Sequence, residues 1–91
     1  MINNINSYTY ISTATATQVY TGACTLVALV VNATAAGTVS IIDGTSGVLP
    51  TVGQLKASVV EGTYEYNVTM GNGLRINTAA ASNVTVVWRV K

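Results

Sequence analysis

Apolar and polar side chains alternate with a period of two along the second half of the chain. Between Tyr64 and Met70 every second residue is apolar, and the residues in between are polar. This alternation predicts a β-strand with one buried face. The turn-forming sequence Gly-Asn-Gly follows at 71–73, and Leu74–Asn77 alternates again. Together these features predict a hairpin of two antiparallel strands.

The same pattern predicts further strands. The last of them, Val84–Val90, places valines and Trp88 on one face. Three other candidates lie earlier in the chain: Ser7–Ser12, Gln18–Thr21 and Gly37–Asp43. Residues 24–31 are apolar at nearly every position, which favours a central strand that is covered on both faces.

The alanine-rich pieces at 33–36 and 79–81 are too short to propagate a helix, and no segment has a helical apolar stripe. Short strands separated by glycine, asparagine and Ala-Ser turns indicate an all-β fold. We expect a single small antiparallel β-sandwich or jelly-roll-like barrel. A chain of 91 residues is long enough for one domain, whose core alone gives marginal stability.

Residues 1–17 differ in pattern from residues 18–91, which we expect to form the sandwich domain. The segment 13–17 alternates threonine and alanine, with no large apolar side chain to anchor it in a core. One interpretation is an N-terminal arm that pairs with a neighbouring molecule. The other is an ordinary edge strand of the same domain.

Two segments of the chain resemble each other. Residues 32–42 align without gaps on residues 77–87, with identical residues at Asn32/Asn77, Ala35/Ala80, Ala36/Ala81 and Val39/Val84. Each segment predicts a strand, a small-residue loop and a second strand. They are either two equivalent hairpins or the product of a shared composition rich in alanine, threonine and valine.

Charge is scarce and balanced, with four basic and three acidic side chains and none at all in Met1–Ile42. Nucleic-acid binding requires a basic stripe that neutralises phosphates, and four scattered cations do not provide one. We therefore expect no nucleic-acid partner. A surface of hydroxyls, amides and alanines instead favours packing against other protein, because no ionic groups must be desolvated.

The residues needed for catalysis or metal binding are nearly absent. Histidine does not occur, and the only cysteine, Cys24, lies in an apolar run that favours a buried hydrophobe over a reactive thiol. Acid–base and nucleophilic catalysis usually need a histidine or a carboxylate pair. Glu61 and Glu65 are expected to be solvated surface charges. We predict no catalytic residue, no metal site and no cofactor.

The N-terminal sequence lacks the basic and apolar regions of a signal peptide. Threonine and asparagine interrupt every apolar run that could span a bilayer. We therefore expect synthesis in a cytoplasm and no membrane partner.

The aromatic residues divide into two groups. Tyr64, Tyr66 and Trp88 alternate in phase with valine and methionine, which predicts that they lie in the core. Tyr8 and Tyr10 lie in the uncharged N-terminal segment and, together with Ile11, are the predicted interface residues. Tyrosine suits such a role because its ring is apolar and its hydroxyl forms hydrogen bonds.

Two longer runs carry a family resemblance. Val31–Leu49 contains a strand, a small-residue loop and a strand that ends in Asp-Gly-Thr-Ser. Gly71–Trp88 contains an Asn-Gly-Leu turn before an alternating final strand. In these features residues 18–91 resemble the small virion proteins of tailed bacteriophages.

The resemblance implies a capsid decoration or cement protein with a β-sandwich fold. Such proteins often sit as trimers on the outer shell and join neighbouring capsomers. It therefore implies a homotrimer that is made in the host cytoplasm, resides on the capsid surface and contacts the major capsid protein or another virion protein. The alternative is a carbohydrate- or receptor-binding module of a tail fibre or head fibre, with tyrosines as sugar platforms. A third hypothesis, a subunit that builds a shell by itself, is disfavoured by the small size of the chain.

Overall fold

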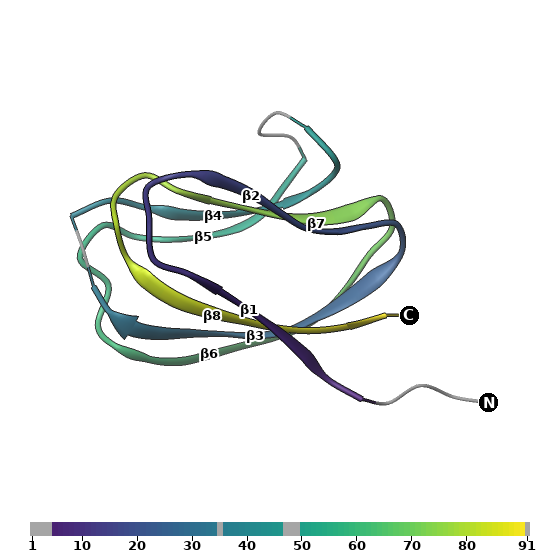
Figure 1. Ribbon diagram of the computed structural model, residues 1–91, viewed down its shortest axis with the longest axis horizontal. Coiled ribbons are helices and arrows are strands. Elements are labelled where there is room, and N and C mark those ends of the chain that lie inside the picture. Colours follow the sequence, from purple (N-terminus) through teal and green to yellow (C-terminus); the bar gives the residue numbers. More distant parts are fainter. Residues whose placement is uncertain (1–4, 35, 47–49, 91) are drawn as a thin grey trace.

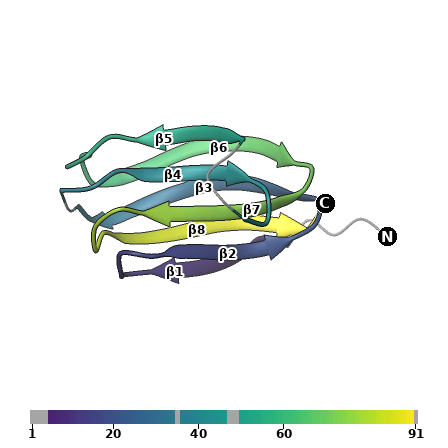
Figure 2. The same cartoon turned by 90° about the horizontal axis from the view of Figure 1, so that it is seen from above.

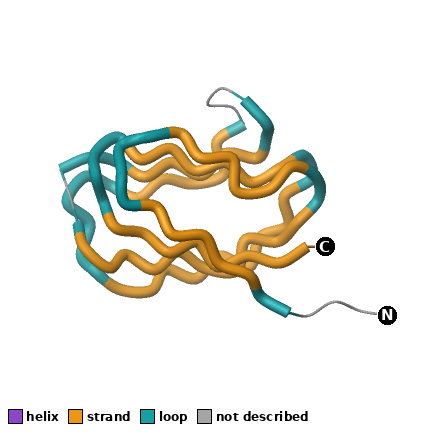
Figure 3. Tube along the Cα trace, viewed as in Figure 1, coloured by secondary structure: helices purple, strands orange, loops and turns teal. Residues whose placement is uncertain are grey.

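The computed structural model describes residues 5–34, 36–46 and 50–90. These residues form eight strands and no helix (Figure 3). The strands are β1 (Ser7–Ile11), β2 (Ala16–Thr21), β3 (Cys24–Ala33), β4 (Val39–Asp43), β5 (Thr51–Leu55), β6 (Gly62–Met70), β7 (Gly73–Thr78) and β8 (Asn83–Val90). In the described ranges there is no helix with the length and apolarity that a membrane crossing requires.

The strands form two four-stranded antiparallel sheets that lie face to face (Figure 1). Sheet A has the order β1-β8-β3-β6, and sheet B has the order β2-β7-β4-β5. The chain crosses between the sheets at every connection except the one from β4 to β5. Strand pairs are nested around that connection: β4 with β5, β3 with β6, β2 with β7 and β1 with β8. This is the topology of an eight-stranded jelly roll, and the predicted small antiparallel β-sandwich is confirmed.

The core lies between the two sheets. Because successive side chains of a strand point to opposite faces, each strand contributes alternate residues to it. Fully enclosed side chains from both sheets include Leu26, Leu29, Ile41, Met70, Leu74, Ile76, Val84 and Val86. Each large apolar side chain removed from water contributes about 1.5–3 kcal/mol of stability. Because the two sheets share this cluster, each needs the other to be stable.

The prediction that the strands on either side of the turn 71–73 form a hairpin is wrong. Its first strand, β6, pairs with β3 in sheet A, whereas its second strand, β7, pairs with β2 and β4 in sheet B. The turn therefore carries the chain from one sheet to the other. Each strand has one apolar face, and the two faces enter the common core from opposite sheets. Alternation shows which face of a strand is buried, but it does not show which strand lies beside it.

β3 is a central strand, as its apolar sequence predicts, and it lies between β8 and β6. Its side chains Leu29 and Val31 are buried beneath sheet B, and Val30 between them points outward and is half-buried. The expectation that both faces are covered is wrong for the part of the chain that the structure describes, since only sheet B packs against β3 there.

The N-terminal segment belongs to the sandwich. β1 pairs with β8 along all of Ser7–Ile11 and forms one edge of sheet A, so this segment is an edge strand and not an arm. The expected boundary after residue 17 falls inside β2 and does not divide the structure. Residues 12–15 carry the chain from sheet A to sheet B, a short crossing for which small side chains are sufficient. Residues 1–4 lie outside the described residues.

The two similar segments, 32–42 and 77–87, are not hairpins within a sheet. One connects β3 to β4 and the other connects β7 to β8, so each crosses between the sheets. Their loops lie against each other: Ala79 N donates to Thr38 O over 2.9 Å. A Cβ atom at Gly37 would lie 2.6 Å from the backbone nitrogen of Ala80. Small residues are therefore required where the two loops meet. Ala35, which is part of the alignment, lies outside the described residues.

Candidate interaction surfaces

The outer face of sheet A carries an open group of aromatic and aliphatic side chains. The register places Tyr8 beside Val87 and Tyr10 beside Thr85. On the other side of β8, Ala28 lies beside Val87 and Val30 beside Thr85. Cross-strand neighbours project from the same face of a sheet. We call this group the sheet A patch; it consists of Tyr8, Tyr10, Ala28, Val30, Thr85 and Val87.

The two tyrosines are the most exposed members of the sheet A patch. Tyr8 is 76% exposed and Tyr10 is 54% exposed, although most large apolar side chains of this protein are enclosed. Thr85 has its hydroxyl occupied, because Asn32 Nδ2 donates to Thr85 Oγ1 over 3.0 Å. The patch therefore presents aromatic rings and aliphatic groups, with the two exposed tyrosines at its edge. This is the chemistry of a protein contact, in which tyrosine is enriched.

Ile11 does not join the two tyrosines on this surface. It is 4% exposed and lies opposite Val84 in the core. The reason is parity: residues 8 and 10 of a strand share one face, and residue 11 belongs to the other. The alternation of the sequence already contained this signal. The role of Tyr8 and Tyr10 in an interface stays a prediction. The side chain of Ile11 packs in the core of its own domain and is not exposed to a partner.

Charged side chains border the sheet A patch and do not enter it. Glu65 on β6 lies beside Ala28, and Arg89 on β8 lies beside Thr25. Arg89 Nη1 donates to Asn6 Oδ1 over 3.4 Å at the start of β1. The centre of the patch can therefore be covered by a partner without desolvating an ionic group.

The aromatic residues predicted for the core do pack against it. Tyr64, Tyr66 and Trp88 are partly buried against the core cluster, which confirms the prediction. Tyr64 donates its hydroxyl to the carbonyl of Val60. Tyr66 lies against Gly53, where an added Cβ would be 3.2 Å from the ring, and burial raises the pKa of the Tyr66 hydroxyl.

The structure places Cys24 in the core and Glu61 on the surface. Cys24 is completely buried, as predicted, and its thiol pKa is raised by burial and then by the charge of Asp43. Glu61 is exposed and accepts a hydrogen bond from Thr34 N over 3.3 Å. Within residues 5–34, 36–46 and 50–90, no group of three or more cysteine and acidic side chains is placed to hold a metal ion.

Asp43, at the end of β4, holds the turn between β6 and β7. Its Oδ1 accepts hydrogen bonds from the backbone nitrogens of Asn72 (2.8 Å) and Gly73 (3.3 Å), and its Oδ2 accepts one from Gly71 (3.1 Å). Desolvation raises the pKa of this carboxyl, but the three backbone donors together outweigh it and lower the pKa below its ordinary value. Asp43 thus stabilises the turn between β6 and β7 through three hydrogen bonds.

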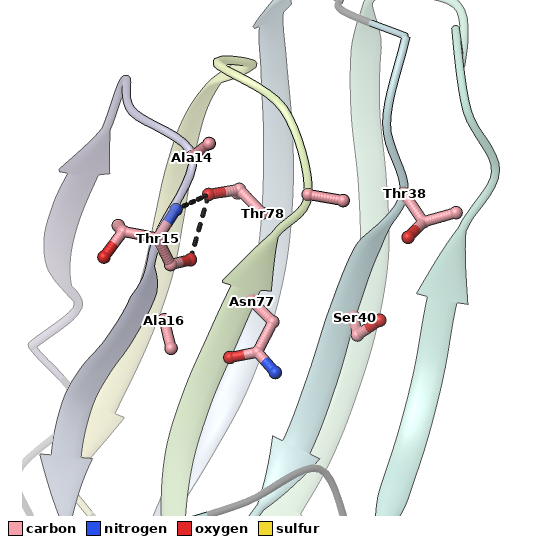
Figure 4. Close-up of a pocket in the computed structure, with 8 residues that line it drawn as sticks. Ala14, Thr15, Ala16, Thr38, Ser40, Asn77 and Thr78 are labelled. Atoms are coloured by element: carbon pink, nitrogen blue, oxygen red, sulfur yellow. Dashed lines mark hydrogen bonds between the residues drawn. The ribbon is translucent and has the colours of Figure 1, made fainter.

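A second surface feature lies on the outer face of sheet B. Ala16 on β2 and Ser40 on β4 flank Asn77 on β7, and these small neighbours leave a hollow of about 370 Å³ (Figure 4). The remaining lining residues are Ala14, Thr15, Thr38, Thr78 and Ala79. Oδ1 of Asn77 is buried and accepts no hydrogen bond from any described residue. Sequence reasoning missed this hollow, because its residues come from three strands that are distant in the chain.

One wall of the hollow is fixed by hydrogen bonds. Thr15 N donates to Thr78 Oγ1 over 3.1 Å, and Thr78 Oγ1 donates to Thr13 O over 2.6 Å. Farther along β7, Arg75 Nη1 donates to Gln18 Oε1 over 3.2 Å, and Gln18 Nε2 donates to Gly44 O over 2.9 Å. Gln18 thus connects β2 with β7 and with the turn that follows β4.

Comparison of the chain with protein-family models, with curated proteins and with solved structures found no match. The inference of function therefore depends on the residues and topology of the chain itself.

Proposed function

We propose that the protein is a non-enzymatic structural protein of a bacteriophage virion, and that it decorates the outer capsid surface as a homo-oligomer and cements it. The observation that carries the binding role is the sheet A patch, in which Tyr8 and Tyr10 are 76% and 54% exposed without a charge among them. The virion setting comes from the resemblance of Val31–Leu49 and Gly71–Trp88 to tailed-phage virion proteins. The jelly roll supports this setting because viral capsid domains use it, as lectin domains also do.

The physical reason for the proposal is the balance between core and surface. The chain of 91 residues buries a small core, and a domain of this size gains stability when it binds other protein. A capsid presents the same contact many times. Multiple contacts of modest affinity then hold the decoration in place, because the effective concentration of each further contact is high.

A rebinding experiment tests the proposal. Particles stripped of the protein are mixed with purified full-length protein and pelleted. We expect wild-type protein to pellet with the particles and the variant Tyr8→Ala/Tyr10→Ala to remain in the supernatant. The control Val60→Ala removes a side chain that is 71% exposed away from the sheet A patch, and it should pellet like wild type. Wild-type protein that stays in the supernatant at every concentration would contradict the proposal.

A second candidate function is a carbohydrate- or receptor-binding module of a tail or head fibre. The observation that favours it is the hollow beside Asn77, which is lined by alanines and by the polar side chains Thr15, Thr38, Ser40, Asn77 and Thr78. Hydroxyl and amide groups can form hydrogen bonds with sugar hydroxyls, and a volume of about 370 Å³ lies in the range of small-ligand sites. A glycan array with wild type and Asn77→Ala decides the matter. Binding that Asn77→Ala abolishes would support this candidate, and an array without hits would dismiss it.

A further inference from the structure

The sandwich has four edge strands, β1 and β6 in sheet A and β2 and β5 in sheet B. An edge strand presents unpaired backbone N–H and C=O groups that can pair with a strand of another molecule. Natural proteins block such edges with charges, prolines, bulges or irregular pairing. Comparison of the four edges therefore shows where the chain permits strand addition.

The edges β5 and β6, which lie together on one side of the sandwich, carry such blocks (Figure 2). β6 contains Glu65, and its pairing with β3 shifts register next to Asn67, which has a φ of 53°. β5 follows Pro50 and precedes Lys56, and its pairing with β4 also shifts register. Strand addition is disfavoured on this side.

The opposite side, formed by β1 and β2, has no charged side chain anywhere in the described residues 5–21. β2 is nevertheless irregular, because its pairing with β7 shifts between Gln18 and Tyr20. β1 pairs with β8 without any shift over Ser7–Ile11, and it contains no charge, proline or glycine. Of the four described edges, β1 alone is both regular and uncharged.

The sequence of β1 is also complementary to itself. Antiparallel pairing of two copies with Thr9 opposite Thr9 places Tyr8 of each copy opposite Tyr10 of the other. Both tyrosine pairs then lie on the outer face, where Tyr8 and Tyr10 are exposed. Aromatic pairs and threonine pairs are favourable cross-strand neighbours. β1 itself carries no charge, and the nearest cation, Arg89, is bonded to Asn6 beyond the N-terminal end of the strand, away from the axis at Thr9. Two copies of β1 therefore pair without like-charge repulsion along the strand, and its self-complementary sequence favours a second copy over an unrelated strand.

We propose that β1 pairs antiparallel with β1 of a second copy about a two-fold axis at Thr9, so that sheet A continues from one molecule into the next. The proposal rests on the proposed function in one respect, namely the association of copies. The two sheet A patches become one continuous surface with tyrosines at its centre. A two-fold contact of this kind gives dimers, whereas the trimer implied by the resemblance would need a head-to-tail contact between different surfaces.

The test measures the mass of the purified full-length protein by sedimentation velocity at micromolar concentrations. We expect wild type to be a dimer. Tyr8→Lys/Tyr10→Lys places like charges opposite each other across the axis and should raise the dimer dissociation constant at least about tenfold. In Tyr8→Glu/Tyr10→Lys, the introduced glutamate of each copy faces the introduced lysine of the other, so the dimer should return. Val60→Lys, at a site that is 71% exposed and not on β1, should remain dimeric. Circular dichroism shows that each variant is folded.

The outcomes separate this inference from the proposed function. A wild-type monomer or trimer, or a dimer that survives Tyr8→Lys/Tyr10→Lys, overturns the pairing of β1. So does a double variant with opposite charges that stays monomeric like the lysine variant. A dimer that obeys the charge pattern but never binds particles supports the pairing of β1 and contradicts the virion role.

Discussion

Trp88 on β8 donates a hydrogen bond from its indole Nε1 to Thr9 Oγ1 on β1 over 3.2 Å. The same indole contacts Tyr20 on β2, with ring centroids 5.1 Å apart and planes inclined by 36°. One side chain therefore joins the edge strands of both sheets to the core. The outward face of β1 is left free for Tyr8 and Tyr10, while its inward face is anchored.

Loss of this anchor should destabilise the protein. Thr9→Val keeps the shape of the side chain but removes the acceptor of Trp88 Nε1, which is part-buried. We expect the free energy of unfolding to fall by about 1 kcal/mol, because a donor loses its partner. Urea denaturation measures the change. The matched control is Thr63→Val on the exposed edge strand β6, which should change stability by less than about 0.5 kcal/mol. Equal effects at the two sites would refute the role of the hydrogen bond.

Contact between the two small-residue loops should make Gly37 intolerant of a side chain. Gly37→Ala would place its Cβ 2.6 Å from Ala80 N and 2.7 Å from Ala80 Cβ. We expect a loss of about 1–3 kcal/mol, as for other overpacked sites. Gly71→Ala is the control, because the nearest atom to its added Cβ is 4.0 Å away and its φ is not positive. Thermal denaturation of both variants checks this, and a Gly37→Ala protein as stable as the control would show that the loops can separate.

The three hydrogen bonds at Asp43 make stability depend on pH. The pKa of this carboxyl is lower in the folded than in the unfolded protein, where it is about 3.9. Its contribution is therefore complete above the unfolded pKa and is lost as pH falls through the folded pKa. Asp43→Asn should be less stable than wild type at neutral pH, and the difference should shrink below about pH 4. Denaturation curves at several pH values measure it.

The control for this pH series is Glu65→Gln, which removes an exposed carboxylate from β6. At neutral pH its stability should stay within about 0.5 kcal/mol of wild type, as for other exposed substitutions. A constant difference between wild type and Asp43→Asn at all pH values would contradict the account of the turn.

Cys24 should behave as part of the core. It is 0% exposed, and burial followed by the charge of Asp43 raises the pKa of its thiol. We expect a thiol reagent to label the folded protein far more slowly than the urea-unfolded protein, with labelling limited by unfolding. The single cysteine makes the assay direct. Rapid labelling under native conditions would show an open core or a reactive thiol.

The sequence predicts the fold class because its strands alternate strongly. β6 begins two residues before the expected strand Tyr64–Met70, and β8 begins one residue before the expected strand Val84–Val90. Both end at the expected residue. β5 was missed, because Thr51–Leu55 is mostly exposed and contains Gly53, so it has no clear apolar face. The partner of β6 was also missed, since alternation does not identify neighbours across a jelly roll.

Of the two candidate surfaces, the sequence predicts part of the sheet A patch but not the hollow on sheet B. The exposure of Tyr8 and Tyr10 is consistent with their uncharged, strand-like sequence. Because successive side chains of a strand point to opposite faces, alternation alone would have placed Ile11 on the face opposite the two tyrosines, in the core. The hollow beside Asn77 could not be predicted. It exists because the topology places the small side chains of Ala16 on β2 and Ser40 on β4 on either side of Asn77 on β7.

Residence on virions is measured by fractionating particles on a density gradient and detecting the protein with an antiserum raised against the purified chain. The protein should band with intact particles and leave that fraction when the particles are dissociated. If it remains at the top of the gradient while the shell protein bands with the particles, the virion role is wrong.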